Sequence, residues 1–384
     1  MARGYTQTED VTRTTTTSAT YQNKIGTFLN TSQNNVLFMT CLLDNSVTNS
    51  DARVRLRNNT DGIDELVFNI EAQDTTDVYP IIGFTLREGS GFFGLEKQYD
   101  LEYSSESGGT TGISDAYLVR LELVGTDRFN QNLASGSTTS SVFANLCSVT
   151  CEAGNWLILA SGEINTQDIS PATTLNFQLH DGTNQLANTG PPYVQDATNY
   201  TPLWMAAYVS PTTTQNYTLR WKSDGAATLQ ARNMRLLALD LSQFKSYRIN
   251  ADPNPVTVTG VTMTEIERLD ANYVGDDFYL LIFACSNSGT ATNSSQLLKF
   301  TLDNGNGSGD TDLNTRLISR EMNDVNEYYD MGGVVVANLK NKKNILKQVA
   351  NTEVSGQSTT SKNNLIAMLQ LGNTRLNRRT ITVR

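Results

Sequence analysis

The chain repeats itself three times, and this internal repeat restricts its fold more than any other feature of the sequence. Each copy contains an apolar run of strand length, followed by a short segment in which apolar and polar residues alternate. The apolar runs lie at 36–41, 156–160 and 279–285, and the alternating segments at 54–57, 177–180 and 300–303. Alternation with a period of two is typical of a half-buried strand. The repeat therefore predicts three related β-rich domains.

Turn signals and closing strands support the same division. The alternating segments lead to Asp61-Gly62, Asp181-Gly182 and Asn304-Gly305, where glycine can adopt the positive φ of a tight hairpin turn. Each copy ends on another apolar strand, at 117–123, 236–241 and 365–371. A unit of about 120 residues can close its own core, whereas solenoid repeats are much shorter. Short strands with frequent turns are typical of an antiparallel sandwich.

We therefore predict an all-β fold with three tandem antiparallel β-sandwich domains of jelly-roll type. The predicted ranges are 1–27 for an extended Thr-rich arm, 28–125, 140–242 and 256–372 for the sandwiches, and 373–384 for a basic tail. Asn, Ser, Gly and Pro cluster between the sandwiches, which is typical of linkers. Helix formers at a helical period occur only at 317–329 and 338–349, so any inserted helix is expected in the third copy.

Composition limits the partners of the chain. Its formal net charge is -10, which argues against general binding to nucleic acid or to anionic membranes. No apolar run is long enough to span a bilayer, and the first residues lack the apolar core of a secretory signal, so synthesis in the cytoplasm is expected. The basic spot is the tail with Arg375, Arg378, Arg379 and Arg384. It either pairs with an acidic neighbour, including another copy of the chain, or ends in solvent.

The residues for common catalytic and metal sites are scarce. The single histidine, His180, excludes most histidine catalysis and zinc chemistry, and a surface polar role is expected for it. Cys147 and Cys151 fall on one face of a strand; whether they pair stays open, and burial as small apolar residues is the favoured interpretation. The loop 303–312 is rich in Asp and Asn but has glycines at its alternate positions. A mobile turn is favoured over a calcium site there.

No catalytic, cofactor-binding or metal-binding residue is assigned, and no enzyme activity is predicted. Trp156, Trp204 and Trp221 could form a platform for a sugar or a base, but core packing is the preferred interpretation. Paired acids such as Asp64-Glu65 have no partner chemistry nearby in the sequence. They are expected to be solvated.

An acidic, Thr- and Asn-rich chain of tandem jelly-roll-like sandwiches with a polar arm resembles the structural proteins of tailed bacteriophage virions. Within that group it resembles capsid decoration proteins and head or tail appendages. The resemblance implies a location in the virion, assembly in many copies and no catalysis. It also implies the major capsid or tail protein of the same particle as partner.

The favoured function is a capsid decoration protein that the N-terminal arm anchors to the particle. A homotrimer is the favoured oligomer, although three copies in one chain could also form an internal pseudo-trimer. Two alternatives remain: a tail or fibre adhesin that binds a host receptor or glycan, and a head-to-tail connector. An adhesin would expose Trp or Tyr side chains at loop tips. A glycosidase would need two carboxylates across a cleft, and no sequence feature requires that pair.

Overall fold

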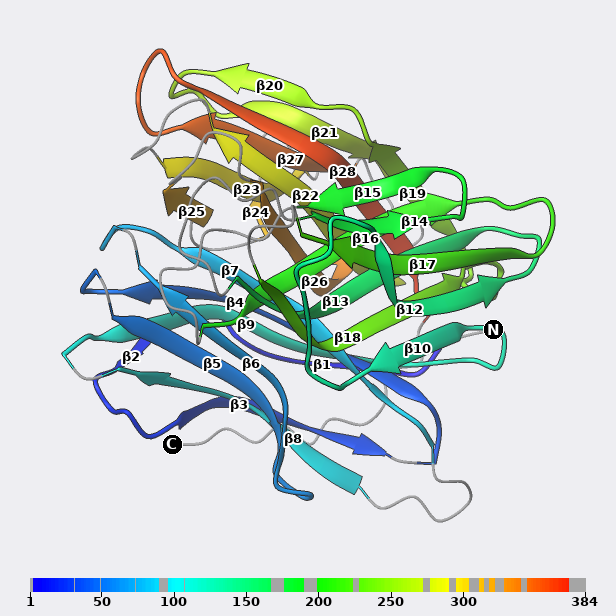
Figure 1. Cartoon of the computed structure of the whole chain (residues 1–384), viewed down its shortest axis with the longest axis horizontal. Coiled ribbons are helices and arrows are strands. Elements are labelled where there is room, and N and C mark those ends of the chain that lie inside the picture. Colours follow the sequence, from blue (N-terminus) through cyan, green and yellow to red (C-terminus); the bar gives the residue numbers. More distant parts are fainter. Residues whose placement is uncertain are drawn as a thin grey trace.

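The computed structural model describes residues 3–30, 32–48, 50–72, 74–89, 96–106, 108–166, 176–189, 199–223, 228–271, 277–289, 295–303, 311–313, 318–321, 328–339 and 344–372. Within these ranges the chain consists of β-strands and one 3-10 helix, η1 (Leu241–Gln243). No helix in these ranges is long and apolar enough to cross a bilayer. The strands form three sandwiches, which Figure 1 shows in blue to cyan, in green, and in yellow to red. The fold is all-β, as predicted.

Unit 1 consists of two antiparallel sheets. Its strands are β1 (Tyr5–Asp10), β2 (Thr14–Thr16), β3 (Gln22–Asn30), β4 (Asn35–Asn45), β5 (Asp51–Asn58), β6 (Ile63–Glu71), β7 (Tyr79–Arg87), β8 (Glu96–Ser105) and β9 (Thr111–Glu122). One sheet has the order β1-β9-β4-β7, with β2 continuing β1 along β9, and the other has the order β3-β8-β5-β6. We call these the inner and the outer sheet of the unit.

Units 2 and 3 repeat this arrangement. Unit 2 contains β10 (Arg128–Asn132), β11 (Gly136–Thr138), β12 (Ala144–Cys151), β13 (Trp156–Thr166), β14 (Asn176–His180), β15 (Gln185–Thr189), β16 (Thr201–Val209), β17 (Gln215–Lys222) and β18 (Leu229–Asp240). Unit 3 contains β19 (Tyr247–Asp252), β20 (Val256–Thr259), β21 (Thr264–Asp270), β22 (Asp277–Gly289), β23 (Ser295–Asp303), β24 (Thr311–Asp312), β25 (Ile318–Glu321), β26 (Tyr329–Leu339), β27 (Ile345–Thr352) and β28 (Ser358–Gln370). The inner sheets are β10-β18-β13-β16 and β19-β28-β22-β26, and the outer sheets are β12-β17-β14-β15 and β21-β27-β23-β24, with β25 also on β23.

Each unit is a jelly roll, because its strands alternate between the two sheets as two interlocked Greek keys. The predicted hairpins are present in units 1 and 2, where Gly62 at φ +72° and Gly182 at φ +92° lie in the turns β5–β6 and β14–β15. The turn predicted at Asn304-Gly305 lies outside the described residues.

A β-bulge recurs at the same place in every inner sheet. The register between β4 and β9 shifts after Thr40, that between β13 and β18 after Ser161, and that between β22 and β28 after Ala284. The extra residues on the facing strands have positive φ and are Asp115, Asn233 and Asn363. Asp and Asn are the non-glycine residues that best tolerate this conformation. The repeat therefore extends to a detail of backbone geometry.

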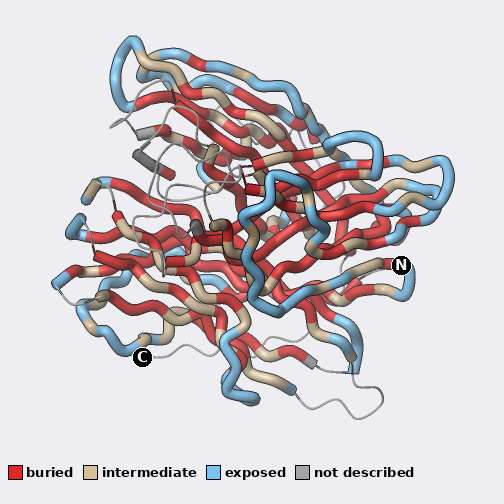
Figure 2. The backbone as a smooth tube through the Cα atoms, in the orientation of Figure 1, coloured by how far each residue is buried: buried red, intermediate tan, exposed pale blue. Residues whose placement is uncertain are grey.

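The three inner sheets pack against one another around a common apolar centre. Three separate cores lie inside the three sandwiches, and a fourth cluster draws residues from all three units. The inner sheets are therefore apolar on both faces: all the described residues of β4 except one are buried. Figure 2 shows the buried segments concentrated where the units meet, with the exposed segments around the rim. The units form one body and are not separate domains on a string.

The predicted arm is not a separate segment. β1 and β2 pair with β9, and β3 pairs with β8, so residues 5–30 supply edge strands of unit 1. Tyr5 is fully buried in the common centre. The prediction failed because an edge strand buries only some of its side chains, and Thr and Gln satisfy the remainder of its surface.

The predicted linkers are also strands, and the sandwich boundaries at 140 and 256 are therefore wrong. β10 and β11 repeat the split edge strand of unit 1, and so do β19 and β20. The units run from about 5 to 122, 128 to 240 and 247 to 370. The helices predicted at 317–329 and 338–349 are wrong as well, since β25, β26 and β27 occupy their described residues. The basic tail 373–384 and residues 304–310 of the candidate calcium loop lie outside the described residues.

Candidate functional site

The structure places the candidate catalytic groups of the sequence in structural roles. His180 is buried, contrary to the expected surface position, and its Nδ1 accepts a hydrogen bond from the backbone N–H of Gly182 at 2.8 Å. Burial, with Arg220 nearby, lowers the pKa of the imidazole. Among the described residues, no group of three or more His, Cys, Asp or Glu side chains is arranged to hold a metal ion.

The cysteines and tryptophans are packing residues. Cys147 and Cys151 are free thiols inside unit 2, and burial raises the pKa of each to about 12. Trp156 and Trp221 lie in the same core, which confirms the packing interpretation. Trp204 is also buried, but it lies in the common centre between the units. No exposed tryptophan platform exists.

The most organised set of polar contacts lies where the three units meet. The last strand of each inner sheet packs on the central strand of the next unit: β7 on β13, β16 on β22, and β26 on β4. This head-to-tail sequence returns to its starting unit, so the units form a closed ring with pseudo-threefold symmetry. We treat the three interfaces of this ring as the candidate functional site.

Two interfaces share the same hydroxyl contact. Thr40 Oγ1 accepts a hydrogen bond from the backbone N–H of Val334 at 3.1 Å, and Ser161 Oγ accepts one from Phe84 at 3.2 Å. Thr40 and Ser161 each precede the bulge of their inner sheet, whereas Ala284 stands at this place in unit 3. The contact is therefore a repeated feature that the third interface has lost.

The unit 2–unit 3 interface uses a tryptophan instead. Trp204 Nε1 donates to the carbonyl of Phe283 at 3.1 Å. A Cβ on Gly332 would lie 2.6 Å from this nitrogen, so the glycine allows the indole to approach. Asp330 is buried beside it, where its carboxylate accepts hydrogen bonds from Ser286 Oγ at 2.8 Å and from the backbone N–H of Trp204 at 3.2 Å. Burial raises the pKa of Asp330 to about 7.

The unit 1–unit 2 interface contains an ion pair between the units, Arg235 with Glu65 at 3.4 Å, and a second ion pair within unit 2 beside it. Glu163 is fully buried and accepts hydrogen bonds from Arg232 at 2.5 Å and from the backbone N–H of Val67 at 3.1 Å. Burial raises the pKa of this carboxyl group despite the cation. Arg235, also buried, donates to the carbonyl of Glu65 at 3.1 Å. Glu65, predicted to be solvated, therefore belongs to an interface.

One buried ion pair joins the start of unit 1 to both inter-unit connections. Arg3 donates to the two carboxylate oxygens of Asp127 at 2.6 and 2.9 Å, and both side chains are almost completely buried. The backbone N–H groups of Val124 and Asp240 donate to the same carboxylate. The Arg3 guanidinium lies over the ring of Phe244, 4.2 Å from its centroid. Arg3 Nε is buried without a hydrogen-bond partner, which offsets part of the gain from this pair.

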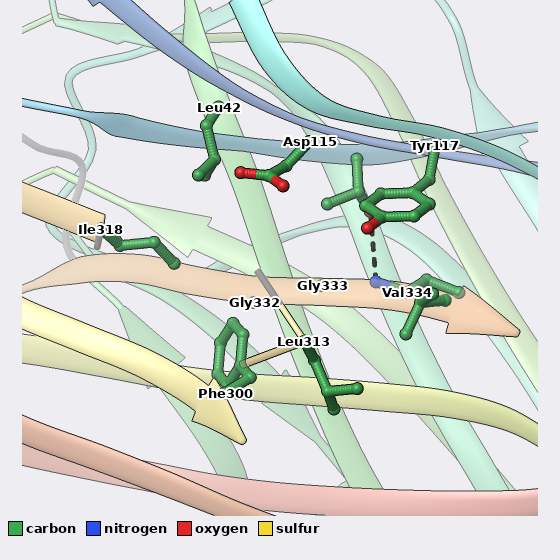
Figure 3. A pocket seen from close by; sticks show the side chains of 11 residues that line it. Leu42, Asp115, Tyr117, Phe300, Leu313, Ile318, Gly332, Gly333 and Val334 are labelled. Atoms are coloured by element: carbon green, nitrogen blue, oxygen red, sulfur yellow. Dashed lines mark hydrogen bonds between the residues drawn. The ribbon is translucent and has the colours of Figure 1, made fainter. Parts of the chain in front are cut away.

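The interfaces differ in how completely they are filled. A cavity of about 30 Å³ lies between units 1 and 3. Figure 3 shows Asp115 and Leu42 facing Phe300 and Ile318 across it. Val334, labelled in that view, donates its backbone N–H to Thr40 Oγ1 beside this cavity. A larger cavity of about 240 Å³ lies between units 2 and 3. Neither cavity could be predicted from the sequence, because each is lined by residues far apart in the chain.

The topology defines the chain as three fused jelly rolls. No protein-family model matches it, and no curated protein sequence matches it significantly. Solved structures that resemble it include one of the triple jelly-roll fold and turret assembly in an archaeal virus, at 13% identity, a TM-score of 0.20 and coverage of 91% of this chain and 83% of that one.

Two further similar structures come from different sources. The infectious bursal disease virus VP2 subviral particle gives 10% identity, a TM-score of 0.26 and coverage of 64% and 73%. The CBM22-1–CBM22-2 tandem domain of Paenibacillus barcinonensis Xyn10C gives 9% identity, a TM-score of 0.22 and coverage of 62% and 92%. TM-scores in this range do not carry a functional argument.

Proposed function

We propose that the chain is a non-enzymatic structural protein of a virus particle. The observation that carries the proposal is the closed ring of three jelly rolls around one apolar centre. The buried charged and polar groups at the interfaces hold the units together. A rigid ring with a polar, weakly charged rim suits repeated contacts with neighbouring subunits.

The finer proposal is a decoration protein on the capsid surface, with the major capsid protein as its partner. Anchoring by residues 1–27 is not retained, since these residues supply edge strands of unit 1. Attachment through the exposed rim replaces it. The internal ring already gives one chain the shape of a trimer, so we expect a monomer in solution in place of the homotrimer. The alternatives to capsid decoration are a position on the tail and a position at the head-to-tail connector, and the same fold would suit each of them.

The experiment combines a native mass measurement with particle labelling. The purified chain should have the mass of one 42.2 kDa subunit. Antibodies raised against it should label the surface of intact particles purified from the source culture, and mass spectrometry of those particles should detect the chain in many copies. Absence from the particles would overturn the proposed function. Labelling confined to the tail would retain the structural role but exclude capsid decoration.

A second candidate function, recognition of a glycan, is favoured by the larger interface cavity. It is compatible with a particle protein, because a surface component can carry a receptor site.

A further inference from the structure

The cavity between units 2 and 3 is not a general consequence of the ring. At the corresponding place between units 1 and 2, Arg235 and Glu163 of unit 2 meet Glu65 and Val67 of unit 1. Between units 1 and 3 the space is about 30 Å³. The unit 2–unit 3 interface keeps about 240 Å³ open. The bulge residue Asn363 borders this cavity, as its counterpart Asp115 borders the small one.

The lining of the larger cavity is neutral and mixed in polarity. It contains amide, aromatic and aliphatic side chains and no charged one. Tyr208 is the aromatic member, with 38% of its surface exposed, and no other aromatic residue appears among the exposed large apolar side chains of the described chain. Its hydroxyl donates to Asn155 Oδ1 at 2.9 Å and is also hydrogen-bonded to Tyr247, so the ring face is the part of Tyr208 that a ligand could contact. Pro253 adds a rigid apolar surface on the opposite unit.

Two amides supply further hydrogen-bonding groups. Gln185 accepts a hydrogen bond from Gln178 through Oε1, so its NH₂ group is available as a donor. Asn363 donates through Nδ2 to the carbonyl of Asn188 at 2.8 Å, so its Oδ1 is available as an acceptor. That bond crosses the interface and fixes the orientation of the amide. A donor, an acceptor and an aromatic ring thus border one space.

We infer that this cavity binds a neutral sugar, as a free monosaccharide or as one residue of a glycan. A sugar ring offers hydroxyl groups to amides and an apolar face to an aromatic ring. The volume corresponds to about eight water molecules at roughly 30 Å³ each and is below the range of drug-sized pockets. One ring is therefore the expected occupant. The inference deepens the second candidate function and is independent of the structural role, because it concerns the isolated chain and holds whether or not the chain is a particle component.

The test is saturation-transfer NMR on the full chain. The probes are glucose, galactose, mannose, N-acetylglucosamine and N-acetylgalactosamine, with N-acetylneuraminic acid as the charged comparison. A single ring with few contacts should bind with a dissociation constant on the order of 1 mM. At least one neutral sugar should give saturation signals, and the charged sugar should give none.

Two variants locate the site. Tyr208→Ala removes the aromatic surface, and Ala251→Trp places a large side chain at the exposed rim of the cavity; each should weaken binding at least tenfold. Tyr21→Ala is the matched control, because Tyr21 stacks under Arg55 on unit 1, far from the cavity. It should bind like the unmodified chain. Thermal unfolding of each variant checks that it is folded.

Three outcomes would overturn the inference. The first is the absence of signals from every neutral sugar at 10 mM. The second is binding that Tyr208→Ala and Ala251→Trp, both folded, leave unchanged. The third is binding of the charged sugar alone, since a neutral lining cannot compensate a carboxylate.

Discussion

Removal of the Arg3 charge tests whether the N-terminus belongs to the folded body. Arg3→Met keeps the aliphatic stem but leaves the Asp127 carboxylate buried without its cation. Loss of one partner of a buried ion pair costs about 3–5 kcal/mol. Two backbone N–H groups still donate to Asp127, at 2.8 and 2.9 Å. We therefore expect the lower end of that range, about 3 kcal/mol.

The assay is differential scanning calorimetry. The entropy of unfolding is about 2.1 cal/mol/K per residue, so it would be about 0.8 kcal/mol/K for a chain whose three units unfold together. A loss of about 3 kcal/mol would then lower the melting temperature of the variant by about 4 °C. If unit 1 unfolded alone, with about 120 residues, its transition would shift by about 12 °C. The common apolar centre predicts the smaller shift in a single transition. Arg128→Met is the matched control, since its ion pair with Glu152 is exposed and contributes at most about 1 kcal/mol.

Two results would refute this reasoning. Equal shifts for Arg3→Met and Arg128→Met would mean that the buried pair does not stabilise the fold. Tryptic cleavage at Arg13 in the native chain, with no change of melting temperature, would mean that the N-terminus is the loose arm that the sequence suggested.

Other predictions concern buried polar groups and thiols. Burial raises the pKa of Asp330 from 3.8 to about 7, so the contribution of this group to stability is complete below pH 4 and falls as the pH rises to about 7, by on the order of 4 kcal/mol. In the Asp330→Asn variant, the melting temperature should depend less on pH over that range. An unchanged slope would contradict the burial of Asp330. Trp204→Phe removes the hydrogen bond from the indole N–H to the Phe283 carbonyl and should cost about 0.5–1.5 kcal/mol in urea unfolding. No change would show that the indole N–H is dispensable. Cys147 and Cys151, with pKa values of about 12, should not react with a thiol reagent at pH 8 until the chain is unfolded; rapid reaction of the native protein would contradict their placement.

The repeat in the sequence was sufficient to predict the jelly-roll units, because their strongest signals are local. The alternation at Val54 and Phe177 marks true strands, and these residues pair with Tyr103 and Trp221 in the two outer sheets. The positions of the hairpin turns could also be predicted, since a backbone with positive φ favours glycine. Short-range chemistry thus determined the elements and their order.

The edges and the interfaces could not be predicted in the same way. The polar edge strand Thr14–Thr16 lacks the alternation of buried and exposed residues that predicts a strand, since its residues are exposed or half-buried. It is a strand because its backbone pairs with β9. Glu65 and Glu163 lie 98 positions apart, and only the ring places both in one interface. One available signal was missed: the unbroken apolar run at 36–39 does not alternate, and unbroken runs are typical of strands buried on both faces.

The ring also explains why so weakly charged a chain buries so many ionisable groups. Three identical subunits would have to use one set of contacts three times, whereas fusion in one chain lets each interface change independently. The chain retains the shared hydroxyl contact at Thr40 and Ser161 but replaces it beside Ala284 with Trp204 and Asp330. An ionic interface, a small gap and an open cavity then occupy equivalent places. A ring of three identical subunits would have the same cavity at every interface, whereas a fused chain can keep a cavity at one interface and fill the equivalent places at the others. Duplication of the jelly roll within one chain therefore allowed the cavity at Tyr208 to diverge from its two counterparts.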